Sequence, residues 1–105
     1  MSDNEKKEYL ELYLVQSPKI ERLSEQMRSN PMASRRYIKQ IRNARKLKKE
    51  IEQNIDRVDG GLLSEVLGQK YLCGKSLEEI ALTLNYSKRH IERLHASAIE
   101  RFTLN

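Results

Sequence analysis

The chain has 105 residues, enough for one small domain with a helical extension but too few for a large enclosed active site. Its 20 Lys and Arg residues outnumber its 15 Asp and Glu residues, and the net charge of +5 favours a polyanionic partner. No apolar run approaches the roughly 18 residues that a membrane span needs, and the N-terminus lacks the apolar segment of a signal peptide. We therefore expect a cytoplasmic protein without a membrane partner.

The sequence shows no recognisable pattern of enzyme chemistry. Its single cysteine, Cys73, cannot form a disulfide within the chain, and we expect it to have a packing or surface role. His90 and His95 are five residues apart on one predicted helix, so they point in different directions, and no cysteine or carboxylate set completes a metal site. There is no phosphate-binding glycine loop and no serine nucleophile motif. We therefore expect that the protein is not an enzyme and that it has no catalytic residue, cofactor, metal or small-molecule substrate.

Two helices are expected before residue 30. Asp3 can cap a helix over residues 3–16, which has an apolar stripe on one side. The stripe consists of Tyr9, Leu10, Tyr13 and Leu14. Pro18 lacks an N–H group and fits best at the first position of a helix, so Ser17 is expected to cap a second helix that runs to about Arg28.

The longest predicted helix runs from Arg35 to about Arg57, after a loop at residues 29–34 that contains a proline and an asparagine. Its apolar residues follow an imperfect heptad, at Ile38, Ile41, Ala44, Ile51, Ile55 and Val58. An isolated helix of this kind is marginal in water, so it needs a partner surface. Two partners are open: the N-terminal helices folded back in an antiparallel hairpin, or the same helix of a second chain.

The same helix carries the densest positive charge of the chain. Residues 35–49 contain eight basic residues and no acidic residue. Lys48 occupies a seam position of the heptad, and the others form either a solvated face or a candidate DNA-backbone patch. The patch residues are Arg35, Arg36, Lys39, Arg42, Arg45, Lys46 and Lys49.

The segment Asp59-Gly60-Gly61 breaks the helical pattern. It divides the chain into two expected parts, an N-terminal helical extension at residues 1–59 and a three-helix unit at residues 60–105. We find no strand signal in either part, so the expected fold class is all-α.

The last three predicted helices form a helix-turn-helix unit. The first helix ends before Gly74, the second begins with a capping box formed by Ser76 and Glu79, and the third begins after the cap Ser87. A tight turn at residues 85–87 joins the second helix to the third. A short helix, a tight turn and a helix with long polar side chains in its first turns form the arrangement that enters the DNA major groove.

This region resembles a known family. From Ser64 to Phe102 the sequence resembles region four of the bacterial sigma-70 factors, in which Tyr-Leu-x-Gly, here residues 71–74, precedes Ser-Leu-Glu-Glu-Ile-Ala-x-x-Leu, here residues 76–84. Residues 85–99 are similar to the C-terminal signature of small sigma-region-four-like transcriptional regulators encoded by phages and prophages of Gram-positive bacteria. The resemblance implies a regulator that binds double-stranded DNA, with RNA polymerase as a further partner.

The third predicted helix supplies the expected DNA contacts. Arg89 and Arg93 can each bond a guanine edge, Glu92 can accept from a cytosine amino group, and Lys88 is placed for phosphate. Further phosphates are expected at the backbone N–H groups that follow Ser87. The other side-chain candidates for phosphate are Lys75, Thr83 and Tyr86, although Tyr86 is as well suited to packing against the supporting helix.

Two classes of function are therefore open. In the first, residues 87–102 form the recognition helix of a sequence-specific transcriptional regulator. In the second, the chain is a protein-interaction module that binds RNA polymerase or inhibits a host nucleic-acid enzyme. We also expect a homodimer built by the N-terminal helices, because a single recognition helix reads only a few base pairs.

Overall fold

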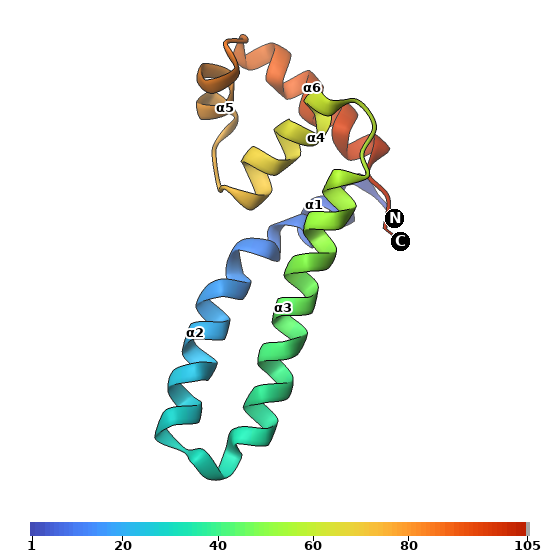
Figure 1. The fold of residues 1–105 in the computed structure, drawn as a ribbon. Coiled ribbons are helices and arrows are strands. Elements are labelled where there is room, and N and C mark those ends of the chain that lie inside the picture. The colour runs from blue at the N-terminus through green and yellow to red at the C-terminus, as the bar shows by residue number, and fades with distance from the viewer. Residues whose placement is uncertain (105) are drawn as a thin grey trace.

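The computed structural model describes residues 1–104, and every regular element in that range is helical (Figure 1). In chain order these are α1 (Asp3–Glu11), α2 (Tyr13–Ser29), the 3-10 turn η1 (Pro31–Ala33), α3 (Ser34–Asp56), α4 (Gly61–Leu67), the π-helical turn η2 (Gly68–Leu72), α5 (Leu77–Leu84) and α6 (Lys88–Arg101). The expected all-α fold with one long helix is confirmed. No helix within residues 1–104 is both long and apolar enough to cross a membrane.

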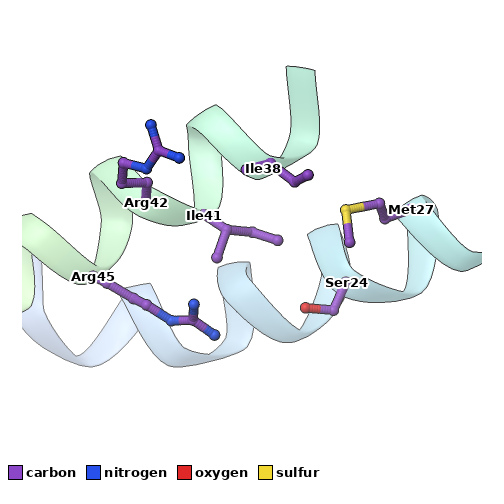
Figure 2. Close-up of a pocket in the computed structure, with 6 residues that line it drawn as sticks. All are labelled: Ser24, Met27, Ile38, Ile41, Arg42 and Arg45. Carbon is purple, nitrogen blue, oxygen red and sulfur yellow. The ribbon is translucent and has the colours of Figure 1, made fainter. Parts of the chain in front are cut away.

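The helices α2 and α3 form an antiparallel hairpin that projects from the other helices (Figure 1). The turn η1 closes the hairpin at the opposite end of the molecule from α5, and the longest axis measures 53 Å. Leu23 of α2 is buried, as are Ile41 and Ala44 of α3, and Figure 2 shows Ile41 pointing toward the part of α2 that carries Ser24 and Met27. The sequence left two possible partners for the long helix α3. The structure shows the partner within the chain, because α2 packs on α3 in an antiparallel hairpin.

The principal hydrophobic core joins the N-terminal helices to the C-terminal unit. Its buried members come from α1, α3, η2, α4 and the end of α6, and include Leu10, Ile51, Ile55, Leu67, Tyr71, Ile99 and Phe102. Lys6 of α1 reinforces this contact, because its Nζ donates to the carbonyl oxygens of Ile99 and Glu100 at 3.0 and 3.1 Å. A cation at these carbonyls also complements the negative end of the α6 dipole. The core therefore extends across the Gly60 turn.

The first helix starts at Asp3 as expected, but its cap is one residue earlier than the sequence indicated. Its N-cap is Ser2, whose Oγ accepts a hydrogen bond from the Glu5 N–H at 3.2 Å, while the Glu5 carboxylate accepts one from the Ser2 N–H. Ser2 has the extended backbone that a cap requires, with φ −74° and ψ 163°. The prediction of Asp3 as the cap was wrong, and Asp3 lies instead in the first turn.

The predicted break at Pro18 was also wrong. The interruption between the first two helices lies at Leu12, and Pro18 is inside α2, so Ser17 caps no helix. A proline within a helix removes one backbone hydrogen bond, here the bond to the Leu14 carbonyl. Both Pro18 and Leu14 are exposed residues, and the helix continues on both sides of the proline.

The C-terminal unit contains the three expected helices, with differences at two of their ends. The first helix is α4 continued by the π-helical turn η2, and the chain then reverses at Gly74. Gly74 has φ +74°, and a Cβ atom there would lie 3.3 Å from Leu14 Cδ1, so both backbone and space favour glycine. Phe102, expected in the last turn of α6, follows that helix with an extended backbone and a fully buried ring.

Candidate nucleic-acid interface

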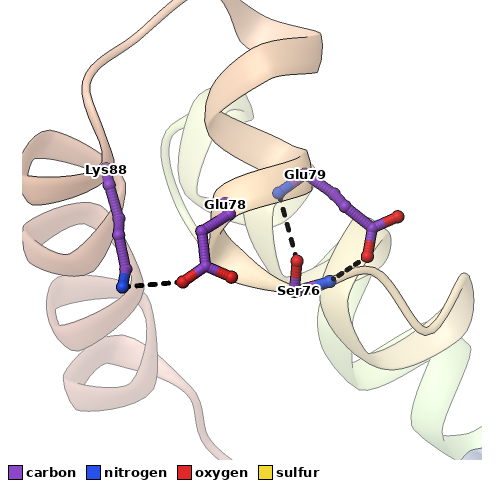
Figure 3. A network of polar contacts seen from close by, with 4 residues as sticks. All are labelled: Ser76, Glu78, Glu79 and Lys88. Atoms are coloured by element: carbon purple, nitrogen blue, oxygen red, sulfur yellow. Dashed lines mark hydrogen bonds and ion pairs between the residues drawn. The ribbon is translucent and has the colours of Figure 1, made fainter.

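Two capped helix starts set the geometry of the helix-turn-helix. At the start of α5, Ser76 Oγ accepts from the Glu79 N–H and Glu79 Oε1 accepts from the Ser76 N–H, both at 3.1 Å (Figure 3). At the start of α6, Ser87 Oγ accepts from the His90 N–H at 3.1 Å. Asn85 has a left-handed backbone, with φ 65°, which ends α5 and turns the chain. Both caps that the sequence predicted for the helix-turn-helix are confirmed.

The helix α6 has one buried face and one polar face. The buried face packs on α4 and α5 and consists of Ile91, His95, Ala98 and Ile99. The side chains of Lys88, Arg89, Glu92 and Arg93 are all exposed. The structure therefore brings the four residues expected at the major groove together within the first two turns of α6.

Lys88 forms an ion pair that the sequence did not reveal. Its Nζ lies 2.7 Å from Glu78 Oε1 in the first turn of α5, so the two helix starts are bridged across the turn (Figure 3). The hydrogen bond and charge of Lys88 lower the pKa of the Glu78 carboxyl, and Glu78 raises the pKa of Lys88 in the same way. No spacing rule links residues of different helices that are ten positions apart, so the sequence alone does not predict this pair.

The remaining phosphate candidates make contacts within the unit. Thr83 Oγ1 donates to the Glu79 carbonyl at 2.9 Å, so this hydroxyl is bonded to its own helix. Lys75 is half-buried before α5. The ring of Tyr86 is 42% exposed and packs on His90 of α6, with ring centroids 4.8 Å apart. Tyr86 thus reaches the surface beside the polar face of α6.

A buried polar pair lies beneath α6. The hydroxyl of Tyr71, in η2, is 2.8 Å from His95 Nε2, in α6. Burial lowers the pKa of His95 to about 4 and raises the pKa of Tyr71 to about 12, so both side chains are neutral near pH 7. With both groups neutral, the tautomer of His95 decides whether the Tyr71 hydroxyl or the Nε2–H group donates in this hydrogen bond. This bond ties α6 to η2.

The basic run of α3 lies on a different part of the molecule. All seven residues of the candidate DNA-backbone patch are exposed along the hairpin, which extends away from α5 and the start of α6 (Figure 1). Lys48 is the one basic residue of this run that is not part of the patch. Its Nζ donates to Ser17 Oγ at 2.7 Å and lies 5.2 Å from the centre of the Tyr13 ring. The structure therefore does not gather the patch with the polar face of α6 into one site.

Comparison with protein-family models, curated proteins and solved structures finds no match for this chain. A function can therefore be inferred only from the geometry of α5 and α6 and from their sequence pattern.

Proposed function

We propose that this protein is a sequence-specific DNA-binding transcriptional regulator of phage or prophage type, with α6 as its recognition helix. The observation that supports this most is the pairing of two capped helices around a left-handed turn, with the polar face of α6 exposed. The helix that enters the major groove must present long polar side chains in its first turns. The resemblance of residues 64–102 to sigma region four favours the same assignment.

In this proposal the contacts divide between bases and phosphates. Arg89 and Arg93 bond guanine edges, and Glu92 accepts from a cytosine amino group. At the start of α6, the His90 N–H donates to Ser87 Oγ. The N–H groups of Lys88 and Arg89, at the first two positions of the helix, point out of the helix end. Such groups bind a phosphate and fix the register of the helix in the groove.

The ion pair between Lys88 and Glu78 modifies the expected role of Lys88. Both side chains are more than half exposed, and exposed pairs of this kind contribute little to stability. A phosphate can therefore replace the carboxylate as the partner of Lys88. While Lys88 is paired with Glu78, the carboxylate reduces the positive charge at the edge of the proposed interface. The ion pair therefore opposes binding to DNA of any sequence.

The proposal is tested by selecting duplexes from a random library with the full-length protein and then measuring affinity for a selected and a scrambled duplex. We expect tighter binding to the selected duplex, with affinity that falls steeply as salt rises. Arg89→Ala should remove most of the preference. Arg101→Ala is the matched control, because Arg101 is exposed on the same helix but three turns further along. Failure to enrich any sequence would contradict the proposal.

The second class of function, a protein-interaction module, is favoured by a separate observation. The α2–α3 hairpin places exposed cations and apolar side chains at the opposite end of the molecule from α5. RNA polymerase and a host nucleic-acid enzyme both remain candidate partners in this class. Co-purification of one of them, together with no affinity for any duplex, would favour this class over the first.

A further inference from the structure

The end of the α2–α3 hairpin contains an open groove. Near the middle of the hairpin, Leu23 and Ile41 are buried, but toward η1 the exposure of apolar side chains rises to 44% at Ile38 and 96% at Met32. Two pockets of about 340 and 450 Å³ adjoin here, since both are lined by Ile38 and Arg42. The two helices alone do not close over this apolar surface.

The floor of the groove is apolar. Figure 2 shows Met27 of α2 and Ile38 and Ile41 of α3 pointing toward a common space between the helices, with Ser24 beside them. Isoleucine gives this floor a fixed shape, while methionine is unbranched and can adapt to a bound side chain. Such a floor gains free energy when an apolar group covers it.

The rim of the groove is cationic. Arg35, Lys39 and Arg42 follow one another at spacings of four and three, so they form one edge, and Arg45 lies at the end of the first pocket. Within residues 1–104 no acidic residue lines either pocket, and none of these four cations forms an ion pair. The rim therefore presents positive charge that no carboxylate of the described chain neutralises.

We propose that this groove binds an acidic amphipathic helix of a protein partner, with its apolar side chains on the floor and its carboxylates against the rim. Arginine pairs well with carboxylates because its planar group offers two parallel donors. A helix with apolar residues at i, i+3, i+4 and i+7 is the usual occupant of a groove between two helices.

Charge distinguishes this occupant from two others. A second copy of the chain placed symmetrically on the groove would bring the same cations face to face, which is unfavourable. A nucleic-acid backbone would satisfy the cations but would leave the floor of Met27, Ile38 and Ile41 without an apolar partner. Because the groove lies at the opposite end of the molecule from α5, it stays accessible when α6 occupies DNA.

The test uses the full-length protein and two fluorescein-labelled peptides of about 18 residues, or five helical turns. In one peptide, leucines occupy one helical face and glutamates occupy the rest. The other has the same composition, with the leucines distributed around the helix. Fluorescence anisotropy near 0.15 M salt, where exposed charges are screened beyond about 8 Å, should show at least ~10-fold tighter binding of the amphipathic peptide.

Two variants locate the site. Ile38→Ser and Arg42→Glu should each weaken binding of the amphipathic peptide by about 10-fold or more, because each removes part of the floor or of the rim. Ile38 is 44% exposed and Arg42 is exposed, so the fold should survive both changes, as circular dichroism melting can verify. Arg101→Glu is the matched control for charge reversal and should leave peptide affinity unchanged.

Three outcomes would overturn the proposal. Equal affinity for the two peptides would mean that charge alone attracts them. Displacement of the peptide by a random duplex from a variant carrying both Arg89→Ala and Arg93→Ala would make the groove a nucleic-acid site. A change from dimer to monomer in Arg42→Glu would assign the groove to a second copy. Each outcome is independent of whether α6 reads DNA, so the two proposals can fail separately.

Discussion

Arg93 projects from the second turn of α6, on the exposed face that we propose enters the major groove. Because a bidentate bond to guanine discriminates between bases, Arg93→Ala should cost about 1–3 kcal/mol on the preferred duplex and relax sequence preference. Titrations of preferred and scrambled duplexes with both proteins measure this difference. Arg101→Ala again serves as the control on the same helix. If both duplexes lose the same affinity, Arg93 contacts phosphate rather than a base.

The partner of Lys88 leads to a second prediction at the scale of single residues. Glu78→Gln keeps the shape of the side chain but removes the negative charge 2.7 Å from Lys88 Nζ. The freed lysine should strengthen binding to duplexes of any sequence and make the dependence of affinity on salt steeper. Salt titrations of both proteins test this, with Glu65→Gln as the exposed control on α4. Weaker binding by Glu78→Gln would show that the pair positions Lys88 for DNA instead.

At the scale of elements, the contact between η2 and α6 predicts a pH dependence of stability. The folded chain lowers the pKa of His95 from 6.5 to about 4, so protonation favours the unfolded chain. The contribution of neutral His95 to the free energy of unfolding is fully present above about pH 6.5. It is lost as the pH falls toward 4, and the free energy of unfolding then decreases by up to about 3 kcal/mol. Urea unfolding across this range measures the loss.

His95→Gln and His90→Gln separate the two histidines in the same experiment. His95→Gln cannot titrate, so its free energy of unfolding should depend less on pH between about 6.5 and 4 than that of the unchanged chain. His90→Gln is the matched control, and its free energy of unfolding should depend on pH in the same way as that of the unchanged chain. An unfolding free energy of the unchanged chain that stays constant across this range would contradict the prediction.

The proline inside α2 leads to a prediction about that helix. Pro18→Ala would restore an N–H donor for the Leu14 carbonyl and relieve the clash of the ring with the preceding turn. We expect the variant to be more stable by about 1–3 kcal/mol, since proline is the least favourable residue in a helix interior. Thermal unfolding tests this, with Lys19→Ala as the control at the next exposed position. A destabilised variant would imply that α2 needs the kink.

At the scale of the whole molecule, dimerisation through the N-terminal helices stays a prediction. The hairpin already gives α3 a partner, so the expected interface moves to apolar residues left exposed at the α1–α2 junction, Leu12 and Val15. We expect sedimentation equilibrium of the intact chain at tens of micromolar to show a dimer that Val15→Glu dissociates. Arg42→Glu is the control at the hairpin groove and should leave the dimer intact. A monomeric intact chain would contradict the prediction.

Structural features with local causes could be predicted from the amino-acid sequence. The capping box at Ser76 and the cap at Ser87 were predictable, because each bond joins residues three positions apart. The polar face of α6 was predictable for the same reason, since helical periodicity assigns each residue to a face from its spacing alone. The all-α fold and the length of α3 likewise follow from sustained apolar spacing.

Contacts between surfaces that are distant in the sequence could not be predicted in this way. The heptad of α3 required a partner but fitted α2 and a second chain equally well, and packing within the chain supplied α2. The contact of Lys6 with the end of α6 and the pair between Lys88 and Glu78 join different helices, where no periodicity operates. Pro18 is the converse case, because a strong local signal to end a helix was overridden. Its cost is the lost hydrogen bond to the Leu14 carbonyl and the clash of the ring with the preceding turn, while packing on α3 stabilises α2.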